Sequence, residues 1–151
     1  MILVTGSNGY IGSHIASQLK KAKKDYIGID NFSYSVKQEN KKIIECDIGD
    51  IKKLSNILKD KNIETVIHTA AASYVNESEI KKKTYYNNNV IKTKKFIDLI
   101  VKKKIKNFIF FSTSNVYKKN NHLNPYREND TKKPINEYGK NKLEIEKFLK
   151  P

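Results

Sequence analysis

The sequence predicts an α/β fold built on a doubly wound parallel sheet. Five short apolar segments alternate with longer amphipathic ones along the 151 residues, and a glycine-rich turn joins the first of each kind. Parallel strands need such helical crossovers, so this alternation indicates β-α-β units. Hydrophobic residues make up 38% and charged residues 30% of the chain, which supports a packed core and argues against disorder. We therefore expect one domain over residues 1–151.

The apolar segments are predicted to be buried strands, because they are short and rich in β-branched and aromatic residues. They lie at Ile2–Thr5, Tyr26–Asp30, Lys42–Cys46, Thr65–Thr69 and Asn107–Ser112. The predicted helices are Tyr10–Ala22, Ile51–Lys59, Thr84–Lys103 and Glu137–Lys150. Asp50 stands before the second helix as an N-cap. The polar stretch 118–136 is too long for a simple turn and is expected to be a functional loop.

The chain is strongly basic, with 30 Lys and Arg against 16 acidic residues and a formal charge of +14. Such a charge suggests nucleic-acid or anionic-membrane binding. Only Arg127 is an arginine, however, so the other 29 cations are lysines, and arginine reads phosphate and guanine better than lysine does. Lysine, asparagine and isoleucine together are what an AT-rich coding sequence produces. We expect no specific nucleic-acid partner and keep a nucleic-acid-associated protein as the least favoured function.

Several other classes are excluded by what the sequence lacks. Cys46 is the only cysteine, which rules out an intrachain disulfide or a Cys-rich metal site and fits a reducing compartment. The three histidines are too scattered for a metal site. No run approaches the about 18 apolar residues of a membrane span, and the chain opens without signal-peptide features. The prediction is a cytoplasmic protein with neither metal nor membrane.

The turn after the first predicted strand has the spacing G-x-x-G-x-x-G and leads into the first helix. Gly6 permits a tight turn, Gly9 lets the backbone approach a pyrophosphate, and Gly12 lets the helix pack close to the strand. The free N–H groups of the helix favour an anion there. The turn therefore predicts a nucleotide site, although glycines can also serve a strand-to-helix turn for steric reasons alone.

Two aspartates follow strands in positions that suit a dinucleotide. Asp30 ends the second strand 18 residues after Gly12, where an acid accepts hydrogen bonds from the adenosine ribose and repels a 2′-phosphate. This favours NAD over NADP. Asp47 ends the third strand and could hold adenine together with Ile48, but an ordinary turn explains Asp47 equally well.

Tyr138 and Lys142 lie at i and i+4 of the last predicted helix and therefore on one face. This spacing can form an acid–base pair. Lowering a tyrosine pKa from about 10 by about 3 units takes about 4 kcal/mol of preference for the phenolate. A neighbouring ammonium and the positive nicotinamide of a cofactor both have the right sign. In a chain with nine tyrosines and 29 lysines, an amphipathic helix explains the spacing alone more simply.

Hydroxyl side chains follow the fifth predicted strand at Ser112, Thr113 and Ser114. The carboxyl ends of strands are where doubly wound sheets bind ligands, and a hydroxyl there can bond a reacting oxygen. Turn chemistry is the favoured explanation of Ser112 and Ser114.

Together these residues resemble the extended short-chain dehydrogenase/reductase superfamily, and most closely its UDP-glucose 4-epimerase family. The resemblance covers essentially the whole chain. The matching stretches are T-G-S-N-G-Y-I-G-S-H at 5–14, I-D-N-F-S at 29–33, C-D-I at 46–48, H-T-A-A at 68–71, E-S at 77–78, Y-Y-N-N-N-V at 85–90, F-I-F-F-S-T-S-N-V-Y at 108–117 and Y-G-K-N-K at 138–142.

The resemblance implies a Rossmann-type domain with NAD as its cofactor. It gives Tyr138 the role of catalytic acid–base and Thr113 that of active-site hydroxyl, both in contact with substrate, while Lys142 binds the nicotinamide ribose and tunes the tyrosine. The implied cofactor-binding set is Gly6, Gly9, Tyr10, Ile11, Gly12, Asp30, Asn31, Phe32, Ser33, Tyr34, Ser35, Asp47, Ile48, Thr69, Ala70, Ala71, Ala72, Ser73, Asn88, Tyr138 and Lys142.

The chemistry that the resemblance implies is isomerisation of a nucleotide sugar, a UDP-hexose, through a 4-keto intermediate. Tyr138 takes the proton of the 4-hydroxyl as hydride leaves C4 for NAD, and hydride returns to the other face. Dehydratases of the superfamily usually carry Asp-Glu after the threonine, where Ser114 and Asn115 stand here, so dehydration is disfavoured. Reductases, decarboxylases and other 4-epimerases stay open.

Three departures from the family pattern leave the sugar undecided. Ser73 stands where many members have lysine, Lys118 replaces a glycine, and Asn141 replaces a serine. Family enzymes also continue for about as many residues again. We therefore expect a sheet that is incomplete at its C-terminal side, without the C-terminal substrate domain. The first hypothesis is a truncated or split 4-epimerase, completed by a missing half or forming a homodimer. The alternative is a non-catalytic NAD-binding module that pairs with another protein.

Overall fold

The computed structural model describes residues 1–34, 43–118 and 125–150. The chain divides into two compact units. Unit 1 comprises Met1–Ala71 and Lys95–Phe111, and unit 2 comprises Ala72–Lys94 and Ser112–Pro151. Each unit has its own architecture and carries its own part of the predicted site.

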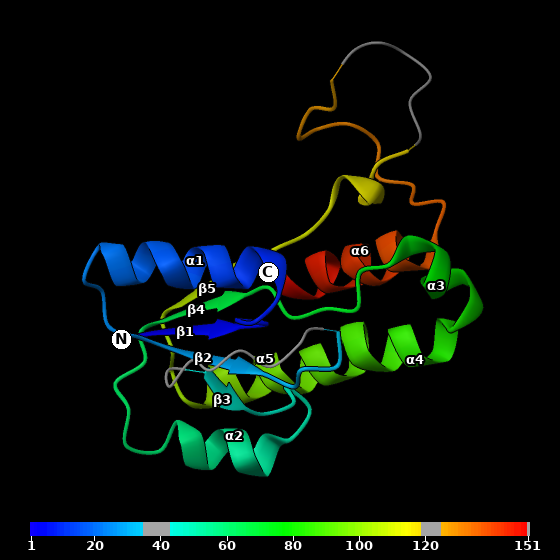
Figure 1. The fold of residues 1–151 in the computed structure, drawn as a ribbon. Helices are drawn as coiled ribbons and strands as arrows, with labels where there is room; N and C mark the ends of the chain where they lie inside the picture. The colour runs from blue at the N-terminus through cyan, green and yellow to red at the C-terminus, as the bar shows by residue number, and fades with distance from the viewer. Residues whose placement is uncertain (35–42, 119–124, 151) are drawn as a thin grey trace. The chain divides into compact units, whose positions relative to one another are not determined.

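Unit 1 contains a parallel five-stranded sheet in the order β3-β2-β1-β4-β5 (Figure 1). The strands are β1 Ile2–Thr5, β2 Tyr26–Asp30, β3 Ile43–Glu45, β4 Thr65–His68 and β5 Asn107–Phe110. Thr5 at the end of β1 is in register with Ile29 of β2 and His68 of β4, so these strands finish at one edge. The predicted doubly wound parallel sheet is confirmed, and the strand order reverses at β1, where such sheets bind ligands.

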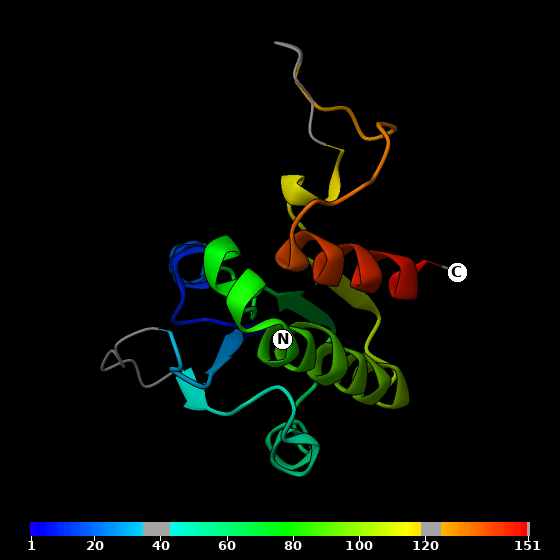
Figure 2. The same cartoon turned by 90° about the vertical axis from the view of Figure 1, so that its right-hand side faces the viewer.

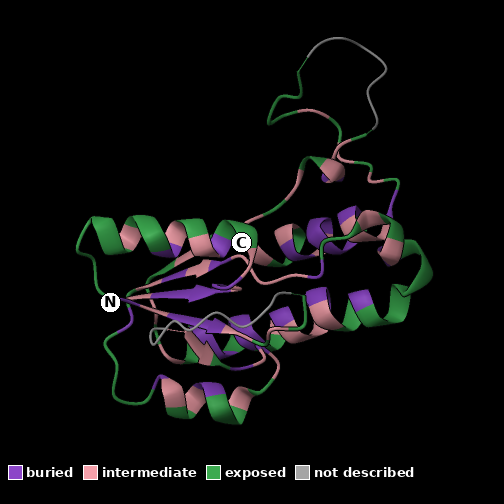
Figure 3. Ribbon diagram, viewed as in Figure 1, coloured by how far each residue is buried: buried purple, intermediate pink, exposed green. Residues whose placement is uncertain are grey.

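Helices cover both faces of this sheet. They are α1 Tyr10–Lys21, α2 Ile51–Ile57 and the part of α5 (Lys92–Lys102) that belongs to unit 1. Val4 packs with Ala16 of α1 on one face, whereas Leu3 packs with Leu54 of α2 and Phe96 of α5 on the other. Successive residues of a strand point to opposite faces, so β1 contributes to both cores. Figure 2 looks at the carboxyl ends of the strands. Figure 3 shows that the buried part of the sheet is at its centre, in β1, β2 and β4.

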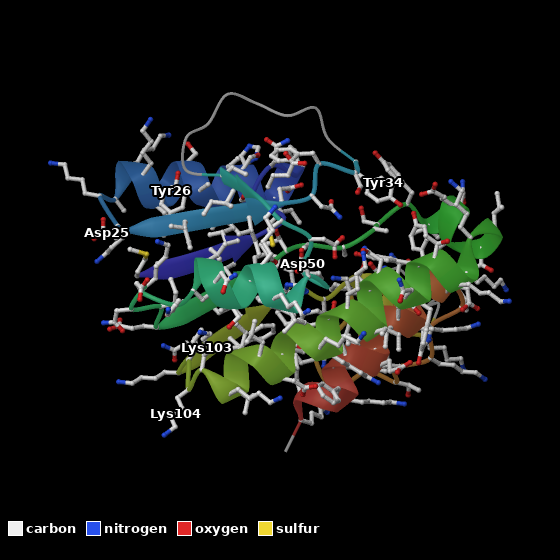
Figure 4. The ribbon with its side chains drawn as sticks, turned by 90° about the horizontal axis from the view of Figure 1, so that it is seen from below. Asp25, Tyr26, Tyr34, Asp50, Lys103 and Lys104 are labelled. Carbon is white, nitrogen blue, oxygen red and sulfur yellow. The ribbon has the colours of Figure 1, made fainter. Side chains whose placement is uncertain are left out.

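One helix of unit 1 begins at a residue that the sequence marks, and another ends at a residue in the left-handed conformation. Asp50 caps α2, as predicted, by accepting a hydrogen bond from the Lys53 N–H at 3.0 Å. The chain leaves α5 through Lys104, whose φ of 54° is left-handed. Figure 4 labels Asp50, and it also shows Lys103 and Lys104 at the end of the sheet where Asp25 leads into β2.

Unit 2 is helical in the residues that the structure describes. Its elements are α3 Val75–Ile80, α4 Lys82–Tyr86, a π-helix Asn87–Ile91, the start of α5, a 3-10 turn Ser114–Val116 and α6 Glu137–Leu149. The prediction of one regular helix over 84–103 is wrong, because the π-helix interrupts it. The wider turn places Asn89 beside Val90 in the interior, and both are buried.

Within residues 1–34, 43–118 and 125–150, no helix has the length and apolar character required to cross a membrane. The same residues contain no group of three or more His, Cys, Asp and Glu placed to hold a metal ion.

At Gly12, the first helix lies directly against the backbone of the glycine-rich turn that follows β1. A Cβ on Gly12 would lie 2.1 Å from the Gly6 carbonyl oxygen and 2.9 Å from the Ser7 Cα. Both neighbours are backbone atoms, so they cannot yield as a flexible side chain would. The predicted role of Gly12 in helix–strand packing is what this geometry requires.

We expect Gly12→Ala to lower the free energy of unfolding by about 1–3 kcal/mol, since an overpacked interior must shift its backbone. Ser17→Ala, at an exposed position of the same helix, is the matched control and should change stability little. Denaturant unfolding of both variants measures the difference. Equal midpoints for the two variants would contradict the close approach.

Candidate active site

The glycine-rich turn presents backbone rather than side chains at the end of β1. Gly6 has φ of 67°, a left-handed conformation that favours glycine. A Cβ on Gly6 would lie 2.7 Å from the backbone nitrogen of Ala70, just after β4. The Gly9 N–H donates to the Gly6 carbonyl at 3.0 Å and tightens the turn. Gly6 is thus required both by the turn and by its contact with the segment after β4.

The amino end of α1 opens on the same turn. Gly9 is its N-cap residue, and no side chain caps the helix. Tyr10 and Ile11 in the first turn are exposed, Tyr10 by 82%. A 12-residue helix with uncapped N–H groups and the positive end of its dipole favours a negatively charged ligand.

The carboxylate of Asp30 is fixed at the end of β2 by two backbone N–H groups. Asn8 donates to Oδ2 at 2.9 Å, and Phe32 donates to Oδ1 at 2.8 Å. Carboxylate oxygens each accept more than one hydrogen bond, so sugar hydroxyls can still be bound. Because Asn8 belongs to the glycine turn, the Asp30 carboxylate lies beside that turn. Its negative charge disfavours a phosphate group placed next to it.

Asp47 links the ends of two neighbouring strands. The Asn31 side-chain amide donates to Oδ2 at 2.8 Å, and the Gly49 N–H donates to Oδ1 at 2.7 Å. The side chain of Ile48 is buried in the apolar core of unit 1. Of the residues predicted to surround the adenosine ribose, Asn31, Ser33 and Tyr34 are exposed and Phe32 is half-buried. Ser35 lies outside the described residues.

The segment after β4 is held against β1 by a buried threonine that the sequence did not indicate. The Thr69 hydroxyl donates to the Thr5 carbonyl at 2.7 Å, and the Ala70 N–H donates to Thr5 Oγ1 at 3.3 Å. Thr5 Oγ1 also lies 2.7 Å from His68 Nδ1. Thr69, Ala70 and Ala71, all predicted cofactor contacts, are half-buried in unit 1.

In unit 2, the side-chain amide of Asn89 bonds both the N–H and the carbonyl of Ala72. Asn89 Nδ2 donates to the Ala72 carbonyl, and the Ala72 N–H donates to Asn89 Oδ1, each at 2.9 Å. The predicted contact Asn88 is half-buried and donates to the same Oδ1 at 3.2 Å, whereas Ser73 is exposed. The sequence did not single out Asn89, although three asparagines inside a helical pattern were a signal, since asparagine is unfavourable there.

The start of α6 is held by side chains outside the helix. Asn136 is the N-cap. Ser78 Oγ accepts from the Tyr138 N–H at 3.2 Å, and Glu79 Oε1 accepts from the Glu137 N–H at 2.7 Å. These contacts satisfy N–H groups that have no partner within the helix, and so they fix the first turn that carries Tyr138.

Tyr138 and Lys142 lie one helical turn apart, with Lys142 Nζ 5.9 Å from the centre of the Tyr138 ring. Lys142 is only 4% exposed, and burial lowers its pKa to about 8. Burial raises the pKa of the Tyr138 phenol. Burial therefore shifts the phenol pKa in the opposite direction to the one that a base needs. Additional positive charge is needed for Tyr138 to act as a base near neutral pH.

The three hydroxyls after β5 have different surroundings. Ser112 Oγ donates to Glu146 of α6, and Glu146 also pairs with Lys132, so Ser112 has a structural role. Ser114 is exposed at the start of the 3-10 turn. Thr113 is half-buried, and its Oγ1 accepts the Asn115 N–H at 3.2 Å. No described residue accepts the Thr113 proton, so this hydroxyl can donate to a ligand.

The buried ammonium yields a test of stability. Because the pKa of Lys142 is about 8 in the folded chain against 10.5 ordinarily, its burial opposes folding below pH 8, and the penalty fades between pH 8 and 10.5. Lys142→Met should raise the free energy of unfolding at pH 7 by up to about 3 kcal/mol, and by less at pH 10. Denaturant unfolding at both pH values checks this, with the exposed Lys147→Met as control. A loss of stability at pH 7 would contradict the expectation.

Comparison with known proteins identifies the family. Residues 2–151 match the model of the NAD dependent epimerase/dehydratase family. A UDP-glucose 4-epimerase from Halalkalibacterium halodurans is 37% identical over 150 residues, which are 98% of this chain and 45% of the relative.

Solved structures of UDP-glucose 4-epimerases are similar to this chain as well. The UDP-glucose 4-epimerase of Brucella ovis in complex with NAD has a TM-score of 0.91 at 34% identity, over 98% of this chain and 46% of that one. The UDP-glucose 4-epimerase of Bifidobacterium longum in complex with NAD+ and UDP has a TM-score of 0.90 at 30% identity, over 98% and 47%. The chain thus spans less than half the length of these relatives. The resemblance in the sequence is confirmed, and the chain belongs to the NAD dependent epimerase/dehydratase family.

Proposed function

We propose that this chain supplies the NAD-binding and acid–base parts of a nucleotide-sugar 4-epimerase of the UDP-glucose/UDP-galactose type. The observation that carries the proposal is the burial of the Lys142 ammonium one turn after Tyr138. Burial of a charge is unfavourable for folding, and groups with perturbed pKa values concentrate at functional sites. Relatives named UDP-glucose 4-epimerase support the choice of reaction.

The residues of unit 1 fit NAD. Close backbone contacts at Gly6 and Gly12 hold the turn in shape. The amino end of α1 has no side-chain cap, so its N–H groups are available to a pyrophosphate. We assign the adenosine ribose to Asp30 and the exposed residues after it, adenine to residues 47–48, and the contacts of unit 1 with the nicotinamide end to residues 69–71. When bound, NAD supplies the reversible hydride chemistry that connects the sugar 4-hydroxyl with a 4-keto group.

The residues of unit 2 supply the proton chemistry. Tyr138 takes the proton of the sugar 4-hydroxyl and returns it, and its phenol makes no hydrogen bond to the described residues, so it is available. The Lys142 ammonium stabilises the phenolate. Thr113 donates a hydrogen bond to the same sugar oxygen. General acid–base catalysis of this kind contributes about 10²–10⁴-fold in rate.

The proposal includes a partner. Because the relatives are more than twice as long as the part that this chain matches, we propose that a UDP-hexose site is completed by a C-terminal half in the same or another chain, or by a second copy. A cytoplasmic location belongs to the proposal, since the buried Cys46 is a free thiol. A silent NAD-binding module is the competing function, and loss of turnover on substitution of Tyr138 separates the two.

Asp30 gives the test of the cofactor. Asp30→Asn should weaken NAD binding about tenfold and reduce the preference over NADP, because a hydrogen-bond acceptor and the repelling charge are lost. Asp25→Asn, an equal change of charge just before the same strand, should leave both affinities unchanged. Calorimetric titration of NAD and NADP measures the effect. Equal affinity of the unsubstituted chain for both cofactors would contradict the assignment.

Tyr138 gives the test of the reaction. Tyr138→Phe should lower conversion of UDP-galactose to UDP-glucose at least about 100-fold, since the proton carrier is removed. The assay uses the chain alone and the chain mixed with a separately expressed C-terminal half of a related enzyme. Tyr86→Phe removes a phenol that donates to Glu144 and is the control. Turnover that survives Tyr138→Phe would refute the proposal, and absence of turnover in every pairing would favour the silent module.

A further inference from the structure

Two asparagines connect the N-cap of α6 with the predicted active-site hydroxyl. We propose that Asn136 and Asn115 are positioning residues that set the direction of the Thr113 hydrogen bond, so that its hydroxyl is presented as a donor. The inference rests on the proposed function, because it assigns to Thr113 a donor role in that chemistry. All the residues involved lie in unit 2.

We call the hydrogen bonds that run from Gly139 through Asn136 and Asn115 to Thr113 the relay. The backbone N–H of Gly139 fixes its direction. The Gly139 N–H can only donate, and Asn136 Oδ1 accepts it at 2.7 Å. Because the Asn136 oxygen accepts this bond from the helix, the NH2 group of its amide points away from the helix N–H and toward Asn115. Asn136 Nδ2 lies 3.2 Å from Asn115 Oδ1 and donates to it. The Asn115 amide is therefore oriented by a partner whose own orientation is unambiguous.

Asn115 passes this orientation to Thr113. Its oxygen faces Asn136, so its Nδ2 faces Thr113 and donates to Oγ1 at 3.2 Å. The Asn115 backbone N–H donates to the same oxygen, also at 3.2 Å. A hydroxyl has two acceptor positions and one proton to donate. Both acceptor positions of Thr113 are filled, and no described residue receives its proton, so the hydroxyl can serve a ligand only as a donor.

Close packing supports the relay. A Cβ on Gly139 would lie 2.4 Å from the Asn115 carbonyl oxygen, so the backbone of α6 touches the turn that carries Thr113. Asn136 is buried, and hydrogen bonds are stronger away from water. A donor held in place before the reaction stabilises negative charge as it develops on a substrate oxygen.

Asn136→Asp separates this role from simple capping. Aspartate caps a helix about as well as asparagine, so the Gly139 N–H keeps its acceptor. Aspartate has no proton to give, however, and two oxygens would then face each other. The Asn115 amide should turn round, donate to the new carboxylate and present its oxygen to Thr113. The threonine proton would then be directed to Asn115 and withheld from a ligand.

Nuclear magnetic resonance of the ¹⁵N-labelled chain measures the orientation without any substrate or cofactor. We expect a nuclear Overhauser effect between the Asn115 side-chain NH2 and the Thr113 methyl group, and its loss in Asn136→Asp. Asp50→Asn, the reverse exchange at the cap of α2, should keep it. Its absence from the unsubstituted chain, or its persistence in Asn136→Asp, would overturn the relay.

Turnover provides the second measurement. Asn136→Asp should lower kcat about 100-fold, the effect of losing one donor to a developing oxyanion, with KM, NAD affinity and the unfolding midpoint unchanged. Asp50→Asn should leave kcat unchanged. A reversed amide with normal kcat would show that the relay does not serve catalysis. If the unsubstituted chain has no turnover under any pairing, the proposed function fails, while the resonance experiment still decides whether the relay exists.

Discussion

The first turn of α6 is the constraint on which the acid–base residues depend. Its backbone N–H groups are accepted by Asn136, Ser78 and Glu79, none of which lies within the helix. A glycine at the third helical position disfavours the helix by about 1 kcal/mol relative to alanine, so these caps, each contributing about 1 kcal/mol, compensate for it. Glycine is needed at position 139 because the backbone of α6 lies against the backbone of Asn115 in the 3-10 turn. The position of Tyr138 therefore depends on hydrogen bonds from neighbouring segments and not on helix propensity.

Burial acts on Tyr138 and Lys142 in opposite directions, yet in both cases it disfavours the charged form. It raises the pKa of the phenol and lowers that of the ammonium to about 8. At neutral pH, the pair therefore consists of a neutral phenol and a mostly protonated amine. In this state the pair gives a proton more easily than it takes one. A base is obtained only when further positive charge adjoins the phenol. The acid–base pair is thus incomplete in the chain by itself, which agrees with a site that works only with a bound cofactor.

The features predicted correctly from the sequence depend on short-range patterns. Apolar runs located the five strands, and glycine spacing located the turn that opens α1. α3 was missed because six residues give too short a pattern, and the π-helix was missed because one extra residue barely alters a helical period. Ser112 could be a ligand or a turn residue until the fold brought it to Glu146, 34 residues later. Asn115 and Asn136 are 21 residues apart, and nothing local in the sequence indicates that they bond.

Both units combine a side chain that accepts a backbone N–H with a glycine that lets two backbone segments touch. In unit 1, a carboxylate at Asp30 accepts a backbone N–H of the glycine turn, and Gly12 lets two backbone segments touch. In unit 2, the amide of Asn136 accepts a backbone N–H of α6, and Gly139 allows the same close approach. In each unit, a side chain outside a backbone segment accepts a hydrogen bond from it and fixes its position. Local geometry formed in this way requires little ordering on binding, and binding energy is then available for differential stabilisation of the reacting state.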